Sequence, residues 1–262
     1  MTIDLAALRA KHAELTNPGG ASEDWTEKYV QLNEGENVVR ILPPSEASED
    51  DGKQFYAETA IHRIPKELTA DGKPRNFHCR KIHGESCPLC DAYYSLWESH
   101  NKLDLPKGDQ SEFSKAARAI KPGKRYYMNV VDRGADNKVK ILSVGIKVFT
   151  KIIDTMLDED YGDITALESG HDFKVVKKQI PGQDWPAYDQ SAPRPKPSKA
   201  MNSAKGISES MDSLHDIYAL AKVESYEDAK ELAELFVPSE VPQKEISDGS
   251  ASDDEFMEKL EK

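Results

Sequence analysis

The chain holds all three of its cysteines within one short stretch, next to two histidines. The stretch NFHCRKIHGESCPLC, residues 76–90, contains Cys79, Cys87 and Cys90 together with His78 and His83. A tetrahedral zinc ion takes four sulfur or nitrogen ligands, and the Cys-Pro-Leu-Cys pair forms the tight turn that directs two thiolates at one ion. The pattern therefore predicts one structural zinc ion, bound by the three cysteines and one histidine.

Three histidines are candidates for the fourth ligand. His78 is the weakest, because adjacent residues such as His78 and Cys79 rarely both reach one ion without backbone strain. His83 would complete a compact loop inside the stretch, whereas His62 would tie the loop to the preceding strand. The spacing alone does not choose between His62 and His83. A set of reduced cysteines without a metal is the competing interpretation, and it is disfavoured because the surrounding residues are mostly polar.

An enzyme is a further interpretation of the same stretch. Zinc-dependent nucleobase deaminases combine a His-x-Glu motif with a later Pro-Cys-x-x-Cys motif. Here His83 and Glu85 precede Cys87, but the interval is too short and no proline stands directly before Cys87. Four candidate protein ligands also describe a closed site, which indicates a structural ion and a protein that is not an enzyme. The alternatives are a zinc-dependent deaminase or nuclease and a zinc-ribbon adaptor in transcription.

Charge is distributed unevenly along the chain, whose formal net charge is −12. Residues 208–262 contain 16 acidic residues against 5 lysines, whereas residues 115–151 contain 10 basic residues against 2 aspartates. A second basic stretch covers residues 173–199, with 6 basic and 2 acidic residues. Both basic stretches contain or adjoin aromatic residues, a composition typical of surfaces on which bases stack while cations follow the phosphates. The sequence therefore predicts binding to single-stranded nucleic acid.

Most candidate nucleic-acid contacts surround two consecutive tyrosines, Tyr126 and Tyr127. Neighbouring side chains on a strand point to opposite faces, so one ring is expected to face the bases while the other packs inward. On the helix expected after the cysteines, Tyr93 is a further candidate, whereas Trp97 is expected to pack in the core. The candidate cations are Lys115, Arg118, Lys121, Lys124, Arg125, Lys138, Lys140 and Lys147.

Hydrophobic periodicity predicts short strands interrupted by helices. Strands are expected within residues 25–43, where two would flank a turn at 33–36, and within 54–64, 122–145 and 171–180, with 122–145 forming a hairpin. Helices are expected over 3–15, 91–100, 111–120, 146–157, 208–222 and 225–236. We therefore predict a mainly β protein with helical additions (α+β), namely an OB-fold-like small barrel with an inserted zinc-binding subdomain and an acidic C-terminal tail.

The order of these features resembles the single-stranded DNA-binding, or helix-destabilising, proteins of T-even-type phages, the gene 32 protein family. The resemblance rests on ENVVRILPPS, on the histidine and cysteines, on HGESCPLC, on a basic strand with tyrosines and on the acidic C-terminus. It covers most of the chain and is strongest over about residues 25–188. By position, the ligands of that family imply a site formed by His62, Cys79, Cys87 and Cys90.

The resemblance also implies further DNA contacts and a biological role. Trp185 and Tyr188 have the spacing of two aromatic DNA contacts in the family, and Arg40 matches a basic position in its barrel strand. The implied function is non-enzymatic: to coat and protect single-stranded DNA, without strong sequence preference, during phage DNA replication, recombination and repair. The implied location is the cytoplasm of the infected bacterial host, and the acidic C-terminal tail is expected to recruit replication and recombination proteins.

Four segments are expected along the chain. They are an N-terminal arm for self-association along DNA (1–20), a DNA-binding core with a zinc subdomain at about 60–105 (21–206), an acidic helical segment (207–237) and a disordered acidic tail (238–262). The arm is less basic than its counterpart in the family, because Asp4 and Glu14 oppose Arg9 and Lys11. No stretch reaches the roughly 18 to 20 apolar residues of a membrane-spanning helix, so no membrane partner is expected.

Overall fold

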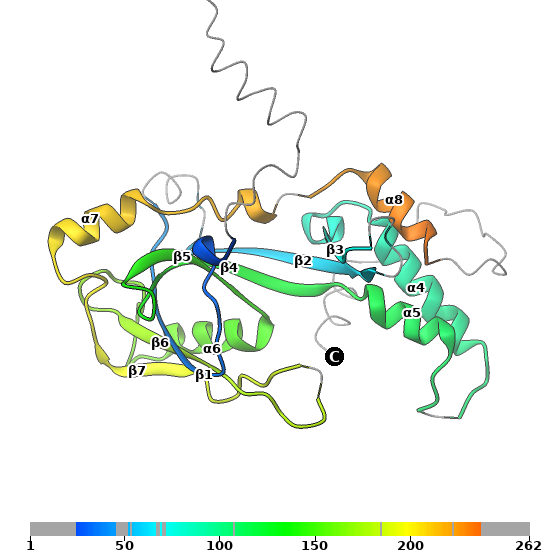
Figure 1. Ribbon diagram of the computed structural model, residues 1–262, viewed down its shortest axis with the longest axis horizontal. Coiled ribbons are helices and arrows are strands. Elements are labelled where there is room, and N and C mark those ends of the chain that lie inside the picture. The colour runs from blue at the N-terminus through cyan, green and yellow to red at the C-terminus, as the bar shows by residue number, and fades with distance from the viewer. Residues whose placement is uncertain are drawn as a thin grey trace, which may run out of the picture.

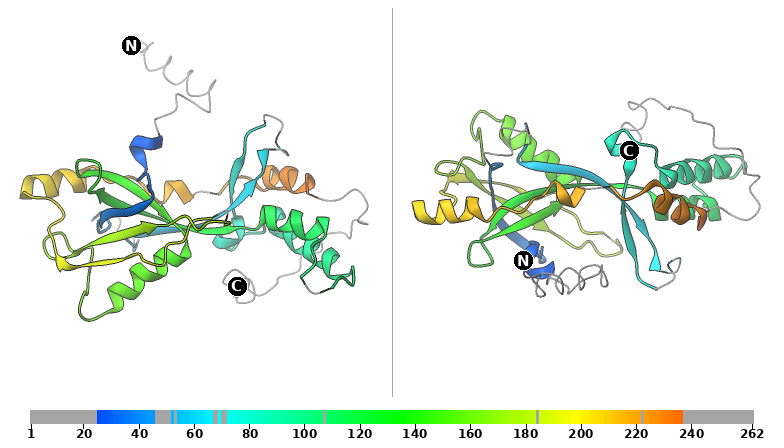
Figure 2. Two further views of the ribbon diagram at one scale, coloured as in Figure 1. Left: turned by 60° about the horizontal axis from the view of Figure 1, so that its bottom comes forward. Right: turned by 90° about the horizontal axis from the view of Figure 1, so that it is seen from above.

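Two lobes joined by a pair of long strands make up the computed structural model (Figure 1). It describes residues 25–236, apart from residues 46–51, 53, 67–68, 70–71, 107, 184 and 222. One lobe contains most of the sheet and the other is mainly helical, and the two further views show the same division (Figure 2). The predicted N-terminal arm, its helix and the acidic tail lie outside the described residues.

An antiparallel sheet of seven strands forms the framework. Its strands are hydrogen-bonded in the order β3-β2-β4-β1-β6-β7, and β5 also pairs with β4. The sheet and the helices around it confirm the α+β class. The strands are β1 Gly35–Ile41, β2 Tyr56–Ile64, β3 Arg75–His78, β4 Gly123–Asp132, β5 Lys138–Val144, β6 His171–Lys177 and β7 Ala192–Pro197.

Strand β4 connects the lobes because it changes partners along its length. Residues 123–128 of β4 pair with β2, whereas residues 130–132 pair with β1. The hairpin partner β5 pairs with β4 from Tyr126 to Asp132, as expected for the predicted hairpin at 122–145. Met128 and Val130 are fully buried where the strands meet. Side chains at both ends of β4 are therefore positioned by one continuous strand.

The helices divide between the two lobes. In the sheet lobe, α6 buries Val148, Phe149 and Ile152 in the cluster that contains β1, β4 and β6. In the other lobe, α4 packs against both α5 and α8. The helices are α2 Trp25–Lys28, α4 Pro88–Asn101, α5 Glu112–Ile120, α6 Ile146–Leu157, α7 Ala204–Asp212 and α8 Tyr226–Glu234, with two short 3-10 helices, η2 Arg80–His83 and η3 Ala219–Ala221.

Predicted helices at 91–100, 111–120, 146–157 and 225–236 are confirmed as α4, α5, α6 and α8. The prediction of two strands within 25–43 is wrong, since a short helix and one strand occupy this range. Here the side chain of Asn37 bonds to the backbone amide and carbonyl of Asn33, at 2.8 Å each, and Gly35 adopts a positive φ of 94°. These local bonds form the turn before Gly35, and upstream of it Tyr29 forms one isolated bridge with Ile141 of β5.

Two further differences follow from tertiary contacts. The helix expected over 208–222 ends at Asp212, because the side chain of Asn129 binds the backbone amide and carbonyl of His215, at 2.9 Å each, and holds that segment out of a helix. The proline-rich residues 192–197, for which no strand was predicted, form β7 at the edge of the sheet. Prolines are tolerated there, because an edge strand needs backbone donors on one side only.

Candidate metal centre and nucleic-acid surface

Four buried side chains converge beside the pair of strands β2 and β3. The first lies on β2, the second directly follows β3, and the other two lie at the start of α4. Their ligand atoms all lie within 4.8 Å of one another, and they are His62, Cys79, Cys87 and Cys90. The structure therefore brings together the four residues that the family resemblance implies as metal ligands.

The spacing of the donor atoms fits a tetrahedral zinc ion. The Sγ atoms of Cys79 and Cys90 are 3.4 Å apart, and Nε2 of His62 lies 3.6 Å from Sγ of Cys87 and 3.5 Å from Sγ of Cys90. Zinc bonds of about 2.3 Å to sulfur and about 2.0 Å to nitrogen, at tetrahedral angles, separate the donors by roughly 3.5–3.8 Å. Nδ1 of His62 lies 2.6 Å from the carbonyl oxygen of Ile120. Nδ1 donates a hydrogen bond to that oxygen, so Nε2 is the nitrogen that can bind the ion.

The backbone around the cysteines holds this arrangement in place. The amide of Cys79 donates to the carbonyl oxygen of Ala60 at 2.7 Å, which fastens the loop to β2. Gly84 ends η2 with a φ of 74°, a conformation that favours glycine. Pro88 stands at the first position of α4, where its fixed φ suits the helix and where it has no amide to satisfy.

The other histidine candidates lie outside the cluster. His83 is exposed on the loop, and Nδ1 of His78 lies 3.0 Å from Oγ1 of Thr59. Of the alternatives that spacing left open, only His62 has a ring nitrogen among the three sulfur atoms.

Burial and the neighbouring sulfur atoms act in opposite directions on His62. Burial lowers the pKa of His62, but hydrogen bonds with Cys79 and Cys87 and their negative charge raise it to about 10. Hydrogen bonds with Cys79 and Cys90 lower the pKa of Cys87, whereas those with Cys79 and Cys87 raise that of Cys90. The negatively charged sulfur atoms thus stabilise a proton on His62, and a metal cation bound at the cluster can replace that proton.

The face of β2 opposite His62 carries positive charge. Arg63 follows His62, is exposed, and points to the opposite face because strand side chains alternate. On the neighbouring strand, Arg125 pairs with Thr59, which lies on the same face of β2 as Arg63. Burial and the positive charge of Arg63 both lower the pKa of Arg125, so the two guanidinium groups lie close enough to interact.

Two aromatic residues lie in the loop after β6, and one of them lies beside Arg125. Tyr188 is half-buried and close to Arg125: burial raises the pKa of Tyr188, and the positive charge of Arg125 acts in the opposite direction. Trp185 lies in the same loop with 67% of its surface exposed, although large aromatic rings are usually covered. A Cβ atom at position 145 would lie 3.0 Å from Nη1 of Arg125, so Gly145 leaves room for that guanidinium. We name Arg63, Arg125 and Tyr188, together with the exposed Trp185 of the same loop as Tyr188, the basic aromatic surface.

The remaining candidate cations divide between exposed and covered positions. Lys124 is covered, with 6% of its side chain exposed and Nζ 3.5 Å from Oε1 of Glu58, and Lys140 is buried on β5. The guanidinium of Arg118 lies 5.7 Å from the ring centre of Trp97 on α4, where Tyr93 is half-buried in the same cluster. The exposed candidates are Lys115, Arg118 and Lys121 beside the helical lobe and Lys138 and Lys147 in the sheet lobe.

Both consecutive tyrosines are buried, with 4% of Tyr126 and 7% of Tyr127 exposed, which corrects the expectation that one ring faces outward. The ring of Tyr126 stacks on Phe149 of α6 at 3.8 Å between centres, and its hydroxyl donates to Glu58 at 3.0 Å. Tyr127 packs in a second buried cluster with Ile217. Strand alternation does send the rings to opposite faces, but α6 covers one face and residues 213–221 cover the other.

Arg40 is also placed differently from the expectation of a phosphate contact. Its side chain is fully buried, and Nη2 donates to the carbonyl oxygen of Ala166. Burial lowers the pKa of this guanidinium, while Asp172 and Asp163 act in the opposite direction. Gly170 makes room for it, because a Cβ there would lie 2.6 Å from Nη2. Arg40 therefore holds the segment around Ala166 on the sheet and has no exposed atom for DNA.

Arg63 is the residue that the sequence interpretation missed. The signal was present, because the residue after a buried strand residue points outward. Once His62 is taken as an inward-facing ligand, Arg63 must lie on the outer face, one strand away from Arg125.

A family model described as "gp32 DNA binding protein like" matches residues 33–237. This range contains all seven strands and the cluster of His62 and the three cysteines. No curated protein matches the chain significantly. In the described part of the chain, none of the helices has the length and apolar character needed to cross a membrane.

Proposed function

The chain belongs to the gp32-like family of DNA-binding proteins, and on that premise we propose that it coats single-stranded DNA without strong sequence preference. The observation that carries this proposal is the basic aromatic surface. It brings two arginines and a half-buried tyrosine close together, and an exposed tryptophan lies in the same loop as that tyrosine. Unpaired bases need a flat ring to stack on, and their phosphates need cations, so this surface offers both partners.

The chemistry of such a surface explains tolerance of sequence. Stacking on an aromatic ring contributes roughly 1–3 kcal/mol per base, and every base has a face that can stack. Arg63 and Arg125 would neutralise phosphates, which are the same at every nucleotide. The exposed candidates Lys115, Arg118, Lys121, Lys138 and Lys147 would extend the path to either side, as would Tyr93. The protein would act without catalysis, as a covering for the strand.

We propose a structural zinc ion at the four-residue cluster and an OB-fold-like barrel as the plan of the sheet lobe. A bound ion would supply four fixed bonds that join β2, the loop after β3 and α4. The hydrogen bond from Nδ1 of His62 to the carbonyl oxygen of Ile120 would orient the imidazole ring toward the ion. The three cysteines would carry the negative charge that neutralises the ion. Because Arg63 lies next to His62, this site would also hold one wall of the basic aromatic surface in place.

The biological role that we propose is protection of single-stranded DNA during phage replication, recombination and repair, in the cytoplasm of an infected bacterium. The acidic residues 238–262 would recruit replication and recombination proteins and, without DNA, would cover the basic surface. A tethered acidic segment has a high effective concentration, and DNA would displace it. Residues 1–20 would contribute self-association along the strand.

Titration of the full chain with oligo(dT), followed by tryptophan emission at several salt concentrations, tests the proposal. We expect quenching, with the logarithm of affinity falling linearly with the logarithm of salt, by about 0.7 per neutralised phosphate. A duplex of equal length is the control and should bind more weakly. Equal affinity for the duplex would favour an adaptor, and turnover of a nucleotide would favour an enzyme.

A further inference from the structure

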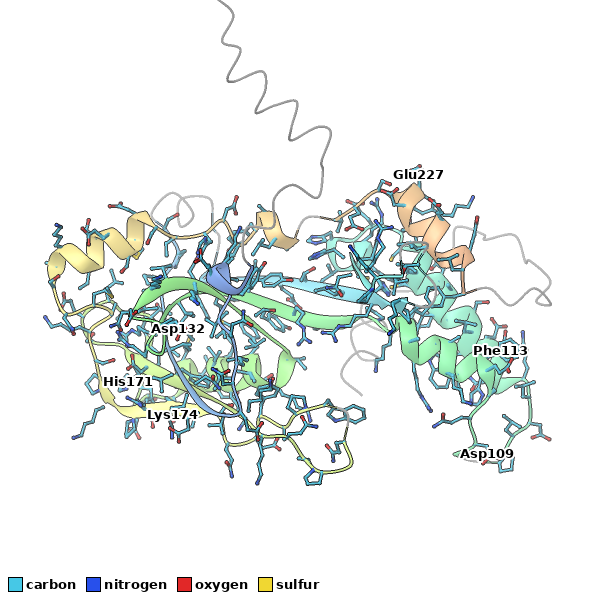
Figure 3. The ribbon with its side chains drawn as sticks, viewed as in Figure 1. Asp109, Phe113, Asp132, His171, Lys174 and Glu227 are labelled. Carbon is cyan, nitrogen blue, oxygen red and sulfur yellow. The ribbon has the colours of Figure 1, made fainter. Side chains whose placement is uncertain are left out.

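Helix α8 begins well after the last strand of the sheet in the sequence. It nevertheless belongs to the core that surrounds the metal cluster. Its residues Ala229 and Ala233, and Phe236 just after it, are buried in one cluster with the three cysteines and with Leu89 and Leu96 of α4. The helix lies alongside α4 in two different views, and its first turn is marked by Glu227 in Figure 3. The acidic end of the chain begins directly after this helix.

A single arginine joins the cysteine loop to the start of α8. Arg80 directly follows Cys79, and its Nε donates to the carbonyl oxygen of Ser86, 3.1 Å away, inside the loop that Cys79 and Cys87 enclose. The other two nitrogens of its guanidinium reach outward. Nη2 pairs with Glu85 of the same loop, whereas Nη1 donates to the carbonyl oxygen of Glu224, two residues before α8.

The contact between Arg80 and the start of α8 is reinforced by an aromatic ring and by a helix cap. The guanidinium carbon of Arg80 lies 6.0 Å from the ring centre of Tyr226, the first residue of α8. Ser225 caps the helix by accepting a hydrogen bond from the amide of Asp228 at 3.1 Å. Only 15% of the Arg80 side chain is exposed, so the guanidinium is held in place by its neighbours although its hydrogen bonds lie at the surface.

The segment before α8 is held by a different part of the molecule. We call residues 213–221 the strap. Asn129 binds both backbone groups of His215, and the hydroxyl of Tyr218 donates to the carbonyl oxygens of Gln54 and Tyr56, at 2.7 and 3.1 Å. Ile217 belongs to a buried cluster of the sheet that contains none of the cysteines. The strap therefore has anchors that do not depend on the cysteine loop.

We propose that α8 is a metal-dependent latch, which Arg80 fastens only while a bound ion keeps the cysteine loop folded. The loop between Cys79 and Cys87 is short and mostly exposed, so four bonds to one ion would provide most of its order. Without the ion, Arg80 would lose its fixed position and the buried face of α8 would lose its partner. Helix α8 would then separate from α4, while the strap would stay attached to the sheet.

This latch would link metal occupancy to the position of the acidic C-terminal segment. Helix α8 carries Glu227, Asp228, Glu231 and Glu234, and the acidic tail follows it. Releasing α8 would lengthen the tether of the tail, because the nearest fixed point would become the strap. The inference rests on the proposed metal site but not on DNA binding, since each part can be tested without DNA.

Hydrogen–deuterium exchange on the full chain, with zinc bound and after removal of zinc by a strong chelator, tests the latch. We expect amides of residues 226–236 and of the cysteine loop to exchange at least tenfold faster without zinc, while the strap and β4 stay protected. Equal protection of α8 in both states would overturn the proposal. So would loss of protection in the strap and β4 together with α8, because that would be general unfolding.

The variant Arg80→Gln separates the latch from the metal itself. With zinc bound, we expect faster exchange at residues 226–236 and unchanged thiolate-to-metal absorption after substitution with cobalt. The matched control Arg194→Gln changes an exposed arginine of β7 and should leave exchange at α8 unchanged. Wild-type protection of α8 in Arg80→Gln would contradict the latch. It would leave the proposed DNA binding intact, because the oligo(dT) titration tests that separately.

Discussion

His62 and Arg63 are consecutive residues of β2 whose side chains lie on opposite faces of the sheet. His62 is fully buried among three sulfur atoms, whereas Arg63 is exposed and its charge acts on Arg125 of β4. Since strand side chains alternate, the register that buries the histidine also presents the arginine. The metal cluster and the basic aromatic surface therefore lie on two faces of one strand, and a change at Arg63 alters the surface without removing a metal ligand.

Replacing Arg63 should weaken DNA binding without affecting stability. For Arg63→Gln we expect about tenfold lower affinity for oligo(dT) at low salt and a salt slope smaller by about 0.7, because one phosphate contact is lost. The measurement is titration at four salt concentrations. Lys205→Gln, on α7 and paired with Glu209 at 3.6 Å, is the control and should behave as wild type. An unchanged slope would remove Arg63 from the DNA path.

Replacing His62 should remove the metal, whereas replacing His83 should not. His62→Gln takes away the nitrogen ligand, and we expect zinc affinity to fall by more than about 100-fold, since losing even an outer partner of a ligand costs roughly 10- to 100-fold. The measurement is competition with a coloured chelator, together with thermal unfolding. His83→Gln changes an exposed histidine of the same loop and is the matched control. Equal loss in both variants would contradict the assignment.

Zinc affinity should rise with pH because metal binding displaces a proton. In the metal-free cluster the pKa of His62 is raised to about 10, although burial alone would lower it, so His62 is protonated at neutral pH. The ion needs a neutral nitrogen and three thiolates, and the raised pKa of Cys90 keeps a second proton in the cluster, so displacing these protons makes apparent affinity rise at least tenfold per pH unit below that value. Chelator competition from pH 6 to 9 would show this, and a flat profile would contradict it.

In the metal-free protein, the contribution of His62 to stability should fall as the pH rises. A histidine whose folded pKa is raised contributes stability that is fully present below its unfolded pKa of about 6.5, and that is lost as pH rises through the folded pKa. For His62 the window runs from there to about 10. The lowered pKa of Cys87 acts in the opposite direction, because its contribution grows as pH rises toward the unfolded value of a thiol. We therefore expect the chelated wild type to lose stability relative to chelated His62→Gln as the pH rises from 6 to 9, and an unchanged difference between them would contradict this.

Trp185 should contribute by stacking on a base. With 67% of its surface exposed, it contributes little to the core, so Trp185→Ala should leave thermal unfolding unchanged. We expect affinity for oligo(dT) to fall by roughly 5- to 150-fold, which corresponds to about 1–3 kcal/mol for one stacked base. Trp185→Phe keeps a flat ring and should retain most of the affinity. Similar losses in the Ala and Phe variants would argue against stacking.

The sequence predicted most elements that have a strong local pattern. The helix at 146–157 and the hairpin at 122–145 were predictable because hydrophobic periodicity and turn residues agree there. The four-residue cluster was predictable once the family pattern was recognised, although spacing alone left His62 and His83 as alternatives. These elements and the cluster could be predicted because they depend on which residue types occur and in which order along the chain.

Other features depend on which segments cover a strand, and no local pattern shows that. Tyr126 and Tyr127 have the composition of stacking residues, yet α6 and the strap cover both rings. The strap itself was expected to be helical, and the long-range contact of Asn129 with His215 prevents this. Burial of Arg40 likewise depends on a segment more than a hundred residues away, which contributes the carbonyl oxygen of Ala166.

Arg40 should therefore affect stability rather than DNA binding. Its guanidinium is fully buried, its charge interacts with those of Asp172 and Asp163, and Nε and Nη1 have no hydrogen-bond partner among the described residues. Arg40→Ala removes the donor to Ala166 and leaves a cavity, so we expect the free energy of unfolding to fall by about 3 kcal/mol. Arg40→Met keeps most of the volume and should cost less.

Denaturant unfolding would measure the loss of stability in both Arg40 variants, and oligo(dT) titration below the unfolding transition would measure binding. Because Arg40 has no exposed atom, the folded variants should bind with wild-type affinity and an unchanged salt slope. The comparison with Arg63→Gln is decisive, since that variant should lose affinity and keep stability. If Arg40→Met instead lost affinity as Arg63→Gln is expected to, while remaining as stable as wild type, Arg40 would be a phosphate contact and its buried position would not persist on DNA.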